Sequence, residues 1–377
     1  MITSPDSPEL AKLCAQLRDR AADLDRAPCW PAEQLRLCGE YGVYQWFVGR
    51  EWGGQGWNEE QVVRGYLALS AACVTTTFII TQRTGACRRI EGCENELLKQ
   101  RWLPGLASGE SFATVGISHL TTSRRHLAKP VLTAERVVRG SPDPASRGSV
   151  GRPATTGFRL DGMAPWVTGG AAADVIVLAA TRVEDGTVTD EQLLLAVPTN
   201  LPGLTVAEPL PLVGVSASST GPVHLQGVEV SDEWVIAGPM RHVMATGVGG
   251  STGALETSTL AIGLSQAAIE FLSDEATRRA DLQQATTALR SEHEQLLSDL
   301  LAAARGETHT SKEIVRQRAN SLVLRATQAA LSAAKGSGYV IGHPAGRWCR
   351  EALFFLVWSC PQPVAAANLC ELAGIQD

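Results

Sequence analysis

Apolar residues recur every three or four positions in the first and the last parts of the chain. Leu10, Leu13 and Leu17 follow this spacing near the start, and Leu296 and Leu300 follow it near the end. Residues three and four apart lie on the same face of a helix, so this spacing predicts amphipathic helices in both parts. Loops that contain Gly or Pro divide each part into several helices.

Between these helical parts the chain changes to short apolar runs separated by Gly, Pro, Asp and Asn. Runs of this length and composition are typical of β-strands, and their regular spacing favours a small antiparallel barrel or sandwich. A stretch rich in Gly, Ser, Pro and Arg, residues 139–156, is predicted to be an exposed loop. The predicted strands are Phe112–Val115, Gly157–Gly162, Val175–Ala180, Leu193–Val197 and Pro222–Leu225.

The pattern therefore predicts an α+β protein with three domains. An N-terminal helical domain covers residues 1–110, a β-rich middle domain covers residues 111–238, and a C-terminal four-helix bundle covers residues 239–377. Asn58 is predicted to cap the helix that carries Val62, because its side chain can accept from unpaired backbone amides. The four helices of the bundle, joined by short loops, are predicted over residues 260–272, 289–301, 314–334 and 352–358.

Composition and charge narrow the class of protein. The chain has 377 residues, of which 44% are hydrophobic, and a formal net charge of −6 with acidic and basic residues interspersed. We therefore expect binding neither to nucleic acid nor to an anionic membrane. No apolar run approaches the roughly 18 residues of a membrane helix, and the N-terminus lacks a secretory signal, so a cytoplasmic protein is expected. Nine cysteines without paired CxxC units predict free thiols and no metal site.

Several short motifs follow one another in a fixed order. This order resembles the acyl-CoA dehydrogenase superfamily along nearly the whole chain. The resemblance implies FAD in a groove between the β-rich domain and the C-terminal bundle. It also implies a homodimer or homotetramer, because in that family a neighbouring subunit usually helps to complete the groove. The motifs are Glu51–Trp57, Leu103–Glu110, Trp166–Gly170 and Gly336–Tyr339, followed by Arg347 and the pair Arg350–Glu351, which resemble structural ion-pair positions of the family.

Trp166 and Thr168 are the first candidates for cofactor binding. The resemblance implies that Trp166 packs beside the isoalloxazine and that the Thr168 hydroxyl bonds near flavin N5. A hydroxyl suits that place because it can both donate and accept, while N5 changes its hydrogen-bonding state on reduction. The alternative is a strand tryptophan in the β-domain core with a β-branched neighbour.

A second flavin-binding strand is implied near residue 115, where the chain departs from the family. Val115 and Gly116 stand where the family commonly has threonine and glutamate. Backbone amides between Val115 and Ser118 could still bond the flavin pyrimidine edge, since main-chain donors survive substitution. Ser118 and His119 are additional polar groups there. His119 is either an acid, base or substrate donor beside the flavin, or a capping or surface histidine.

Further cofactor contacts are implied in the C-terminal bundle. Arg279 resembles the family arginine that reaches the pyrophosphate of a partner subunit's FAD, and Arg278 fits almost as well. Gly336 and Gly338 resemble a glycine pair near the adenosine, where the absence of a side chain permits close approach. An exposed helix arginine and an ordinary helix terminus are the alternatives.

The resemblance to the family does not extend to the residue that serves as catalytic base. Acyl-CoA dehydrogenation needs a carboxylate to take the α-proton, and Ser359, followed by Cys360 and Pro361, stands where most of the family has glutamate. A serine cannot take that proton unaided, and Cys360 could do so only as a thiolate. Some subfamilies place the glutamate at the start of the first bundle helix, where Glu256 lies nearby. Helix capping is the alternative role for that region.

The function predicted from these residues is an FAD-dependent oxidoreductase that oxidises an acyl thioester or a related small substrate. The acyl group would be carried by CoA or by an acyl-carrier protein, and the electrons would pass to an electron-transfer flavoprotein or to O₂. Two alternatives stay open. One is a flavin monooxygenase on the same scaffold, and the other is a non-catalytic protein that binds FAD or an acyl ligand or has lost the flavin.

Overall fold

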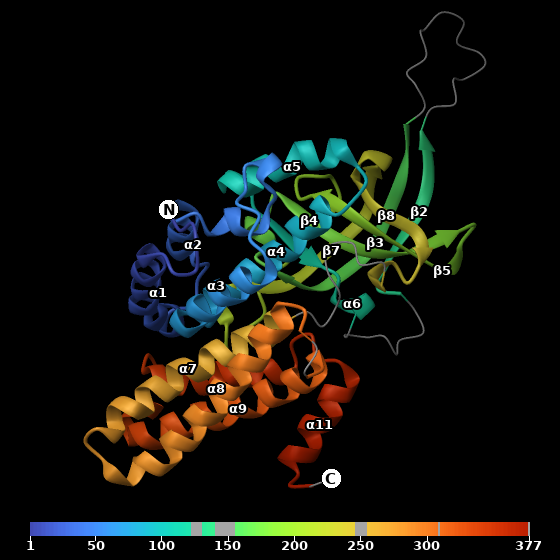
Figure 1. Ribbon diagram of the computed structural model, residues 1–377. Coiled ribbons are helices and arrows are strands. Elements are labelled where there is room, and N and C mark those ends of the chain that lie inside the picture. The colour runs from blue at the N-terminus through green and yellow to red at the C-terminus, as the bar shows by residue number, and fades with distance from the viewer. Residues whose placement is uncertain (122–129, 140–154, 246–254, 308–309, 376–377) are drawn as a thin grey trace, which may run out of the picture. The chain divides into compact units, whose positions relative to one another are not determined.

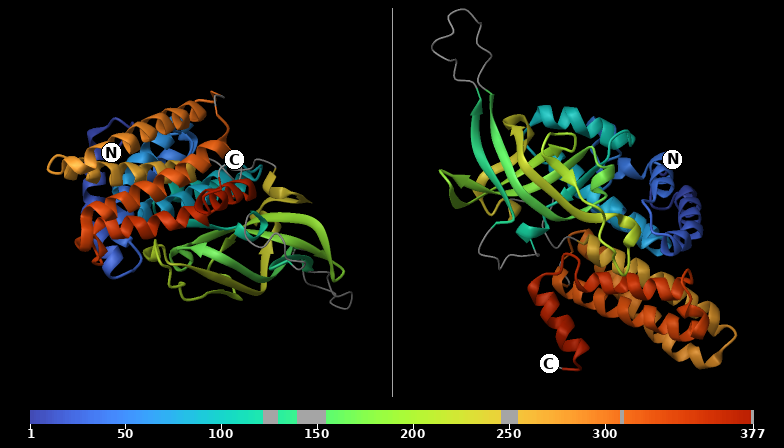
Figure 2. Two further views of the ribbon diagram at one scale, coloured as in Figure 1. Left: turned by 90° about the horizontal axis from the view of Figure 1, so that it is seen from below. Right: turned by 180° about the vertical axis from the view of Figure 1, so that it is seen from behind.

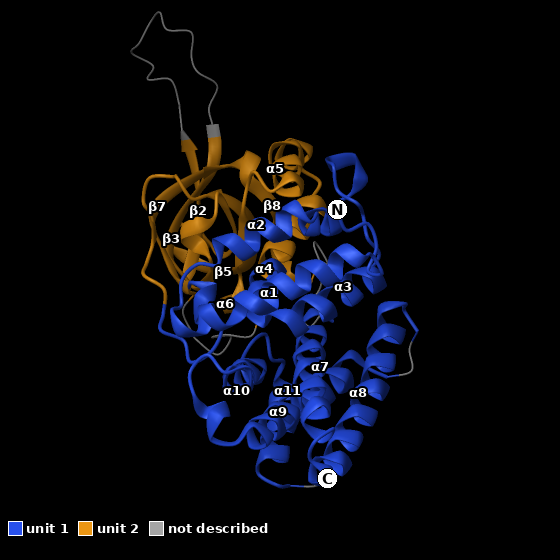
Figure 3. Cartoon of the chain, turned by 90° about the vertical axis from the view of Figure 1, so that its left-hand side faces the viewer, with its two compact units in different colours: residues 1–81, 210–219, 252–377 blue, residues 82–209, 220–251 orange. Residues whose placement is uncertain are grey.

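The computed structural model describes residues 1–121, 130–139, 155–245, 255–307 and 310–375. Their contacts form two compact units (Figure 3). The helical unit comprises residues 1–81, 210–219 and 252–377, and the sheet unit comprises residues 82–209 and 220–251. The first and last parts of the chain therefore share one unit. The division into three separate domains stays a prediction.

The helical unit begins with the helices predicted from the apolar period (Figure 1). Asn58 caps α3 as predicted, because its side chain accepts from the amide of Gln61 while the Gln61 side chain accepts from the amide of Asn58. The helices are α1 (Pro8–Arg26), α2 (Ala32–Glu40), α3 (Glu59–Ala72) and the first part of α4 (Val74–Glu91), and α1 buries Leu10, Leu13 and Leu17.

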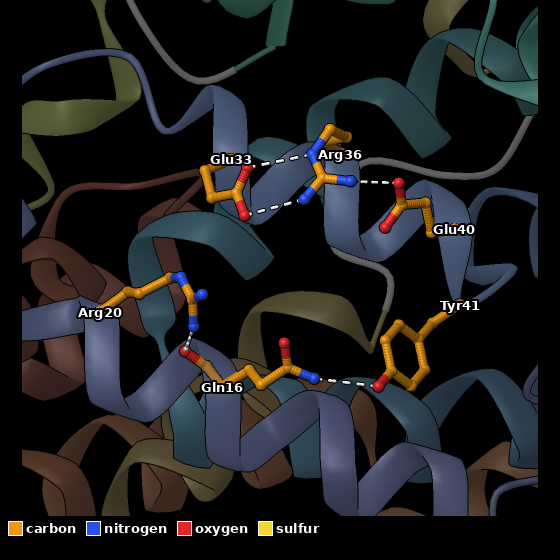
Figure 4. A network of polar contacts seen from close by, with 6 residues as sticks. All are labelled: Gln16, Arg20, Glu33, Arg36, Glu40 and Tyr41. Atoms are coloured by element: carbon orange, nitrogen blue, oxygen red, sulfur yellow. Dashed lines mark hydrogen bonds and ion pairs between the residues drawn. The ribbon is translucent and has the colours of Figure 1, made fainter.

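Polar contacts on the surface of α1 and α2 are drawn in Figure 4. Arg36 forms ion pairs with Glu33 and with Glu40, all three on α2. Gln16 of α1 donates to the hydroxyl of Tyr41, the residue that follows α2, at 2.9 Å. Exposed ion pairs contribute about 0–1 kcal/mol, so the pairs within α2 add little stability, and the hydrogen bond from Gln16 connects α1 to the end of α2.

In its described residues, the C-terminal part of the helical unit has three long helices and two short ones. They are coloured from yellow to red in Figure 2. In this part α7 packs against α8 and α9, and it also packs against α3. Gly263 permits the close approach to α3, because a Cβ there would lie 2.7 Å from the carbonyl oxygen of Leu67. The helices are α7 (Glu256–Ala276), α8 (Gln283–Ala304), α9 (Lys312–Ala334), α10 (Pro344–Leu353) and α11 (Gln362–Leu372).

The helix predicted over residues 352–358 is wrong. Helix α10 ends at Leu353, and a 3-10 turn covers Phe354–Leu356. The aromatic residues there pack on one another instead of extending a helix, and the rings of Phe354 and Trp358 stack at 5.1 Å. Pro361 then caps the start of α11, where a proline is tolerated because no amide is needed.

The sheet unit holds one eight-stranded sheet in the order β6-β7-β3-β2-β4-β5-β8, with β1 beside β4. One face buries apolar side chains that include Leu160, Leu178 and Leu195. Helices α5 (Glu96–Ser108) and α6 (Ser118–Thr121) and the second part of α4 complete the unit. The strands are β1 (Ala113–Gly116), β2 (Leu132–Arg139), β3 (Thr155–Thr168), β4 (Val175–Glu184), β5 (Thr187–Pro198), β6 (Leu204–Val206), β7 (Thr220–Ser231) and β8 (Val235–Arg241).

Four of the five predicted strands lie within observed strands and the fifth, Phe112–Val115, overlaps β1 from Ala113 onward, but the predicted pairing needs correction. The sheet is mixed and not antiparallel, because β1 and β2 both run parallel to β4 along the same edge. It is also open and not a closed barrel, since β6 and β8 end the order of the described strands. Most of the loop predicted over residues 139–156 lies outside the described residues. No described helix combines the length and the apolar character that crossing a bilayer requires.

Candidate functional site

Trp166 occupies an irregular place near the end of β3. Ala164 pairs with Val223 of β7 and Val167 pairs with Gly221, so one extra residue bulges out of β3 between the two pairs. A bulge turns side chains away from their regular direction. Trp166 is 44% exposed, while Ala164 and Val167 are buried. The sheet unit therefore presents a large aromatic ring on its surface, and the alternative of a tryptophan in the β-domain core is wrong.

Thr168 is the buried end of the same strand. Its Oγ1 lies 2.9 Å from Oγ1 of Thr220, the first residue of β7. A hydroxyl has one donor and two acceptor positions, so Thr168 keeps hydrogen-bonding capacity beyond this contact. The exposed indole and the buried hydroxyl thus lie two residues apart, across a bulge that positions both.

The strand β1 lies beside this region with a closely packed end. Val115 is buried and pairs in register with Val177 of β4. A Cβ at Gly116 would lie 2.7 Å from Cδ2 of Leu178 and 3.0 Å from Cβ of Ala164. The glutamate expected from the family resemblance does not fit there without movement of the sheet. Packing therefore explains the glycine at this departure from the family pattern.

Ser118 and His119 open the short helix α6. The hydroxyl of Ser118 is buried and has no hydrogen-bond partner in the part of the chain that the structure describes. His119 is also buried, and its Nε2 donates to the carbonyl oxygen of Ala179 on β4 at 2.7 Å. His119 is therefore not a surface histidine. Its role beside a cofactor stays a prediction, as does that of Ser118.

The candidates in the helical unit form a second group, near the end of α9. Nη1 of Arg279 donates to the carbonyl oxygen of Ala333 at 2.8 Å, which satisfies one of the last carbonyls of α9. Gly336 and Gly338 lie in the 3-10 turn Lys335–Tyr339 that follows. A Cβ at Gly338 would lie 2.7 Å from Cβ of Ala334, whereas a Cβ at Gly336 would meet nothing within 4 Å. Packing requires glycine at 338, and the backbone at 336 is open to a ligand.

The candidate base Glu256 is the first residue of α7, and it is half-buried. A carboxylate is stabilised at a helix N-terminus by the unpaired amides there. The residues on which the capping alternative rests, Thr252 and Gly253, lie outside the described residues. The role of Glu256 as the catalytic base stays a prediction.

A buried arginine that the sequence pattern did not single out holds the turn just before Ser359–Pro361. Nη2 of Arg316, on α9, donates to the carbonyl oxygens of Phe355 and Trp358 at 3.1 and 3.0 Å. Burial raises the pKa of the Cys360 thiol, and the nearby Arg316 offsets part of that rise. Cys360 is thus disfavoured as a thiolate. Nothing in this segment replaces the missing carboxylate.

Arg347, Arg350 and Glu351 form the ion pairs expected from the resemblance. Nη1 of Arg350 lies 2.8 Å from Oδ1 of Asp25, and Nε of Arg347 lies 3.7 Å from Oε1 of Glu351. Asp25 could not be identified from sequence, because 325 positions separate it from Arg350. No group of three or more potential metal ligands occurs among the described residues. All nine cysteines are free thiols, as expected.

Comparison with known proteins agrees with this architecture. Residues 11–110 match the family model of the acyl-CoA dehydrogenase N-terminal domain. A glutaryl-CoA dehydrogenase of Desulfococcus multivorans is 24% identical over 370 residues, which cover 90% of this chain and 86% of that protein. The chain belongs to the acyl-CoA dehydrogenase superfamily. The match to the short-chain acyl-CoA dehydrogenase of Clostridium acetobutylicum, 28% identical, spans only 27% of each chain.

Solved structures of this superfamily share the fold over nearly the whole chain. A glutaryl-CoA dehydrogenase in complex with glutaryl-CoA superposes with a TM-score of 0.76 at 19% identity, covering 98% of this chain and 96% of that one. The dibenzothiophene monooxygenase of Paenibacillus sp. A11-2 gives a TM-score of 0.75 at 14% identity, with 97% and 96% covered. The same enzyme with bound FMN gives 0.77 at 15% identity, with the same coverage. At these identities the likeness concerns the fold.

Proposed function

We propose that this protein is a flavin-dependent oxidoreductase whose flavin ring lies against Trp166 and Thr168. The observation that carries the proposal is the exposed indole of Trp166, which the bulge in β3 turns out of the sheet core beside a buried hydroxyl. An exposed aromatic face next to a hydroxyl suits a planar heterocycle with polar edges. The buried hydroxyl of Ser118, which has no hydrogen-bond partner among the described residues, supplies a further polar group in the sheet unit.

The residues of the chain would bind and orient the cofactor. Trp166 would cover one face of the ring, Thr168 would hydrogen-bond near N5, and backbone amides between Val115 and Ser118 would bond the pyrimidine edge. As the family resemblance implies, Arg279 would reach the pyrophosphate of a partner subunit's FAD, and the open backbone at Gly336 would lie near an adenosine. Bound flavin supplies a two-electron acceptor, which the twenty amino-acid side chains lack. We propose FAD, and the FMN complex of the related monooxygenase makes FMN the alternative.

The substrate we propose is an acyl thioester of CoA or of an acyl-carrier protein, or a related small molecule, with electrons passing to an electron-transfer flavoprotein or to O₂. Similarity to the glutaryl-CoA dehydrogenases supports the thioester. In that reaction Glu256 would take the α-proton. A flavin monooxygenase is the second candidate. It is favoured by the absence of a carboxylate in Ser359–Pro361 and by the likeness to a monooxygenase fold.

Flavin binding is tested by the visible absorbance of the purified full-length protein and by mass analysis of what denaturation releases. We expect a yellow protein that releases FAD. Trp166→Ala should lower flavin occupancy, whereas Val188→Ala, which changes another exposed apolar residue of the sheet unit, should not. If the protein binds neither FAD nor FMN when either is added in excess, the proposal is wrong.

The reaction is tested on the flavin-loaded protein. With acyl-CoA and an artificial electron acceptor, a dehydrogenase turns over under anaerobic conditions, whereas a monooxygenase requires both O₂ and a reductant. Glu256→Gln should abolish the anaerobic turnover. Glu270→Gln, an exposed change on the same helix α7, is the matched control. Full anaerobic activity of Glu256→Gln would exclude Glu256 as the base.

A further inference from the structure

The helical unit contains a pocket of about 190 Å³ that is lined by none of the residues assigned to the flavin. The end of α1, the start of α4, the loop at residues 210–219 and helix α10 line it. Leu24 and Leu212 contribute apolar wall, and the polar side chains come mainly from α1 and α10. We name it the α1–α10 pocket.

One of the two ion pairs in the α1–α10 pocket is complete. Arg350 holds Asp25 through two contacts: Nη2 donates a hydrogen bond to Oδ2 at 2.8 Å, and Nη1 forms an ion pair with Oδ1 at 2.8 Å. The backbone amide of Gly342 donates to the same carboxylate at 3.1 Å. This bidentate geometry satisfies both charges, so neither group needs a further partner.

The second pair is incomplete. Arg347 and Glu351 are 7% and 3% exposed. Nε of Arg347 lies 3.7 Å from Oε1 of Glu351, which is too far for a hydrogen bond, and the Thr75 hydroxyl reaches the same oxygen only at 3.5 Å. The Arg347 guanidinium makes no hydrogen bond with any described residue, and its Nε is buried. Buried ionisable groups are normally hydrogen-bonded, so this pair lacks a bridging partner.

The charges around the pair identify what that partner can be. Asp25 and Arg350 cancel, and the loop at residues 210–219 adds only hydroxyls and no ionisable group. Burial raises the pKa of Glu351 to about 7, although Arg347 opposes the rise. Cys73, which lies just before α4, faces Glu351 as a buried thiol. With Glu351 protonated, the pocket carries one net positive charge, on Arg347.

We propose that the α1–α10 pocket binds a short-chain aliphatic carboxylate, held by the Arg347 guanidinium and by the carboxyl group of Glu351. One carboxylate oxygen accepts from the guanidinium, and the other accepts the O–H of Glu351, which completes both groups. A buried cavity of about 150 Å³ holds benzene, so this pocket has room for a molecule of that size. Leu24 and Leu212 would contact the alkyl chain.

This inference does not depend on the flavin, because none of its residues belongs to the proposed flavin site. The probe is propionate, titrated into the full-length protein by calorimetry at pH 6 and pH 8. We expect saturable binding at pH 6 that weakens about tenfold at pH 8, where about one Glu351 in ten keeps its proton. Binding near pH 7.5 should also take up protons, which calorimetry in two buffers of different ionisation enthalpy measures.

Two variants separate this site from general anion binding. Glu351→Gln keeps a permanent donor, so it should bind propionate equally at both pH values. Arg347→Gln should abolish binding, while Arg26→Gln, which removes an exposed arginine of α1, should not. Circular dichroism checks the fold of Arg347→Gln, and if it is unfolded the pH dependence of the wild type and of Glu351→Gln decides. Absence of saturable propionate binding at pH 6, or equal pH dependence in Glu351→Gln, would overturn the proposal.

Discussion

The buried carboxyl group of Glu351 should make the stability of the ligand-free protein fall as the pH rises. Its pKa is raised from 4.5 to about 7 in the folded protein, chiefly because burial disfavours the charged form. The stabilising contribution is complete below pH 4.5 and is lost as the pH rises through about 7. At 1.36 kcal/mol per pH unit, the difference between these two pKa values corresponds to at most about 3.4 kcal/mol.

Glu351→Gln tests this magnitude, because the amide is close in shape and never ionises. We expect the free energy of unfolding of Glu351→Gln, relative to wild type, to increase by about 1–3 kcal/mol between pH 5 and pH 8. Urea unfolding followed by tryptophan fluorescence and by circular dichroism measures it, and agreement between the two signals checks two-state behaviour. Glu270→Gln is the exposed control and should show no such trend. A difference that stays constant with pH would refute the reasoning.

Further variants test the ion pair and the glycine turn. Asp25→Asn should destabilise the protein by about 1–2 kcal/mol at pH 7, because it removes the carboxylate charge that the partly exposed Arg350 holds. Burial raises the pKa of Asp25, but the hydrogen bonds from Arg350 and Gly342 outweigh burial, so the net pKa lies below its ordinary value of 3.8. The greater stability of the wild type over Asp25→Asn should therefore disappear as the pH falls below 3.8, which acid titrations of stability measure. Gly338→Ala should cost about 1–3 kcal/mol by thermal unfolding because its Cβ would meet Ala334, whereas Gly336→Ala should cost under about 0.5 kcal/mol. Equal melting temperatures for the two glycine variants would contradict the packing argument.

Local pattern alone determined most of the elements. A helix with one apolar face shows its period in any ten residues, so α1, α3, α8 and α9 follow from their own sequences. The Asn58 cap was predictable for the same reason, since donor and acceptor are three residues apart. The five predicted strands were likewise found, because a run of β-branched residues between turn residues is a local signal.

Partners that are distant in the chain could not be predicted in this way. The parallel pairing of β1 and β2 with β4 depends on strands more than 40 positions apart, as the pairs Ala113–Val175 and Thr133–Thr181 show. The false helix over residues 352–358 has a similar cause. Its aromatic residues are compatible with a helix, but packing of Phe354 against Phe78 and Trp358 stabilises a turn instead.

The features of the candidate site likewise separate into those that local sequence predicted and those that depend on distant contacts. The order of short motifs in the sequence determined the superfamily and drew attention to Trp166 and Thr168, because each motif is a contiguous string. Only the tertiary structure decided that Trp166 is exposed by a bulge, that His119 is bound to Ala179, and that Arg347 and Glu351 share a pocket with Asp25. Exposure, hydrogen bonds and pKa depend on what surrounds a side chain, and those surroundings come from segments that the chain brings together only by folding.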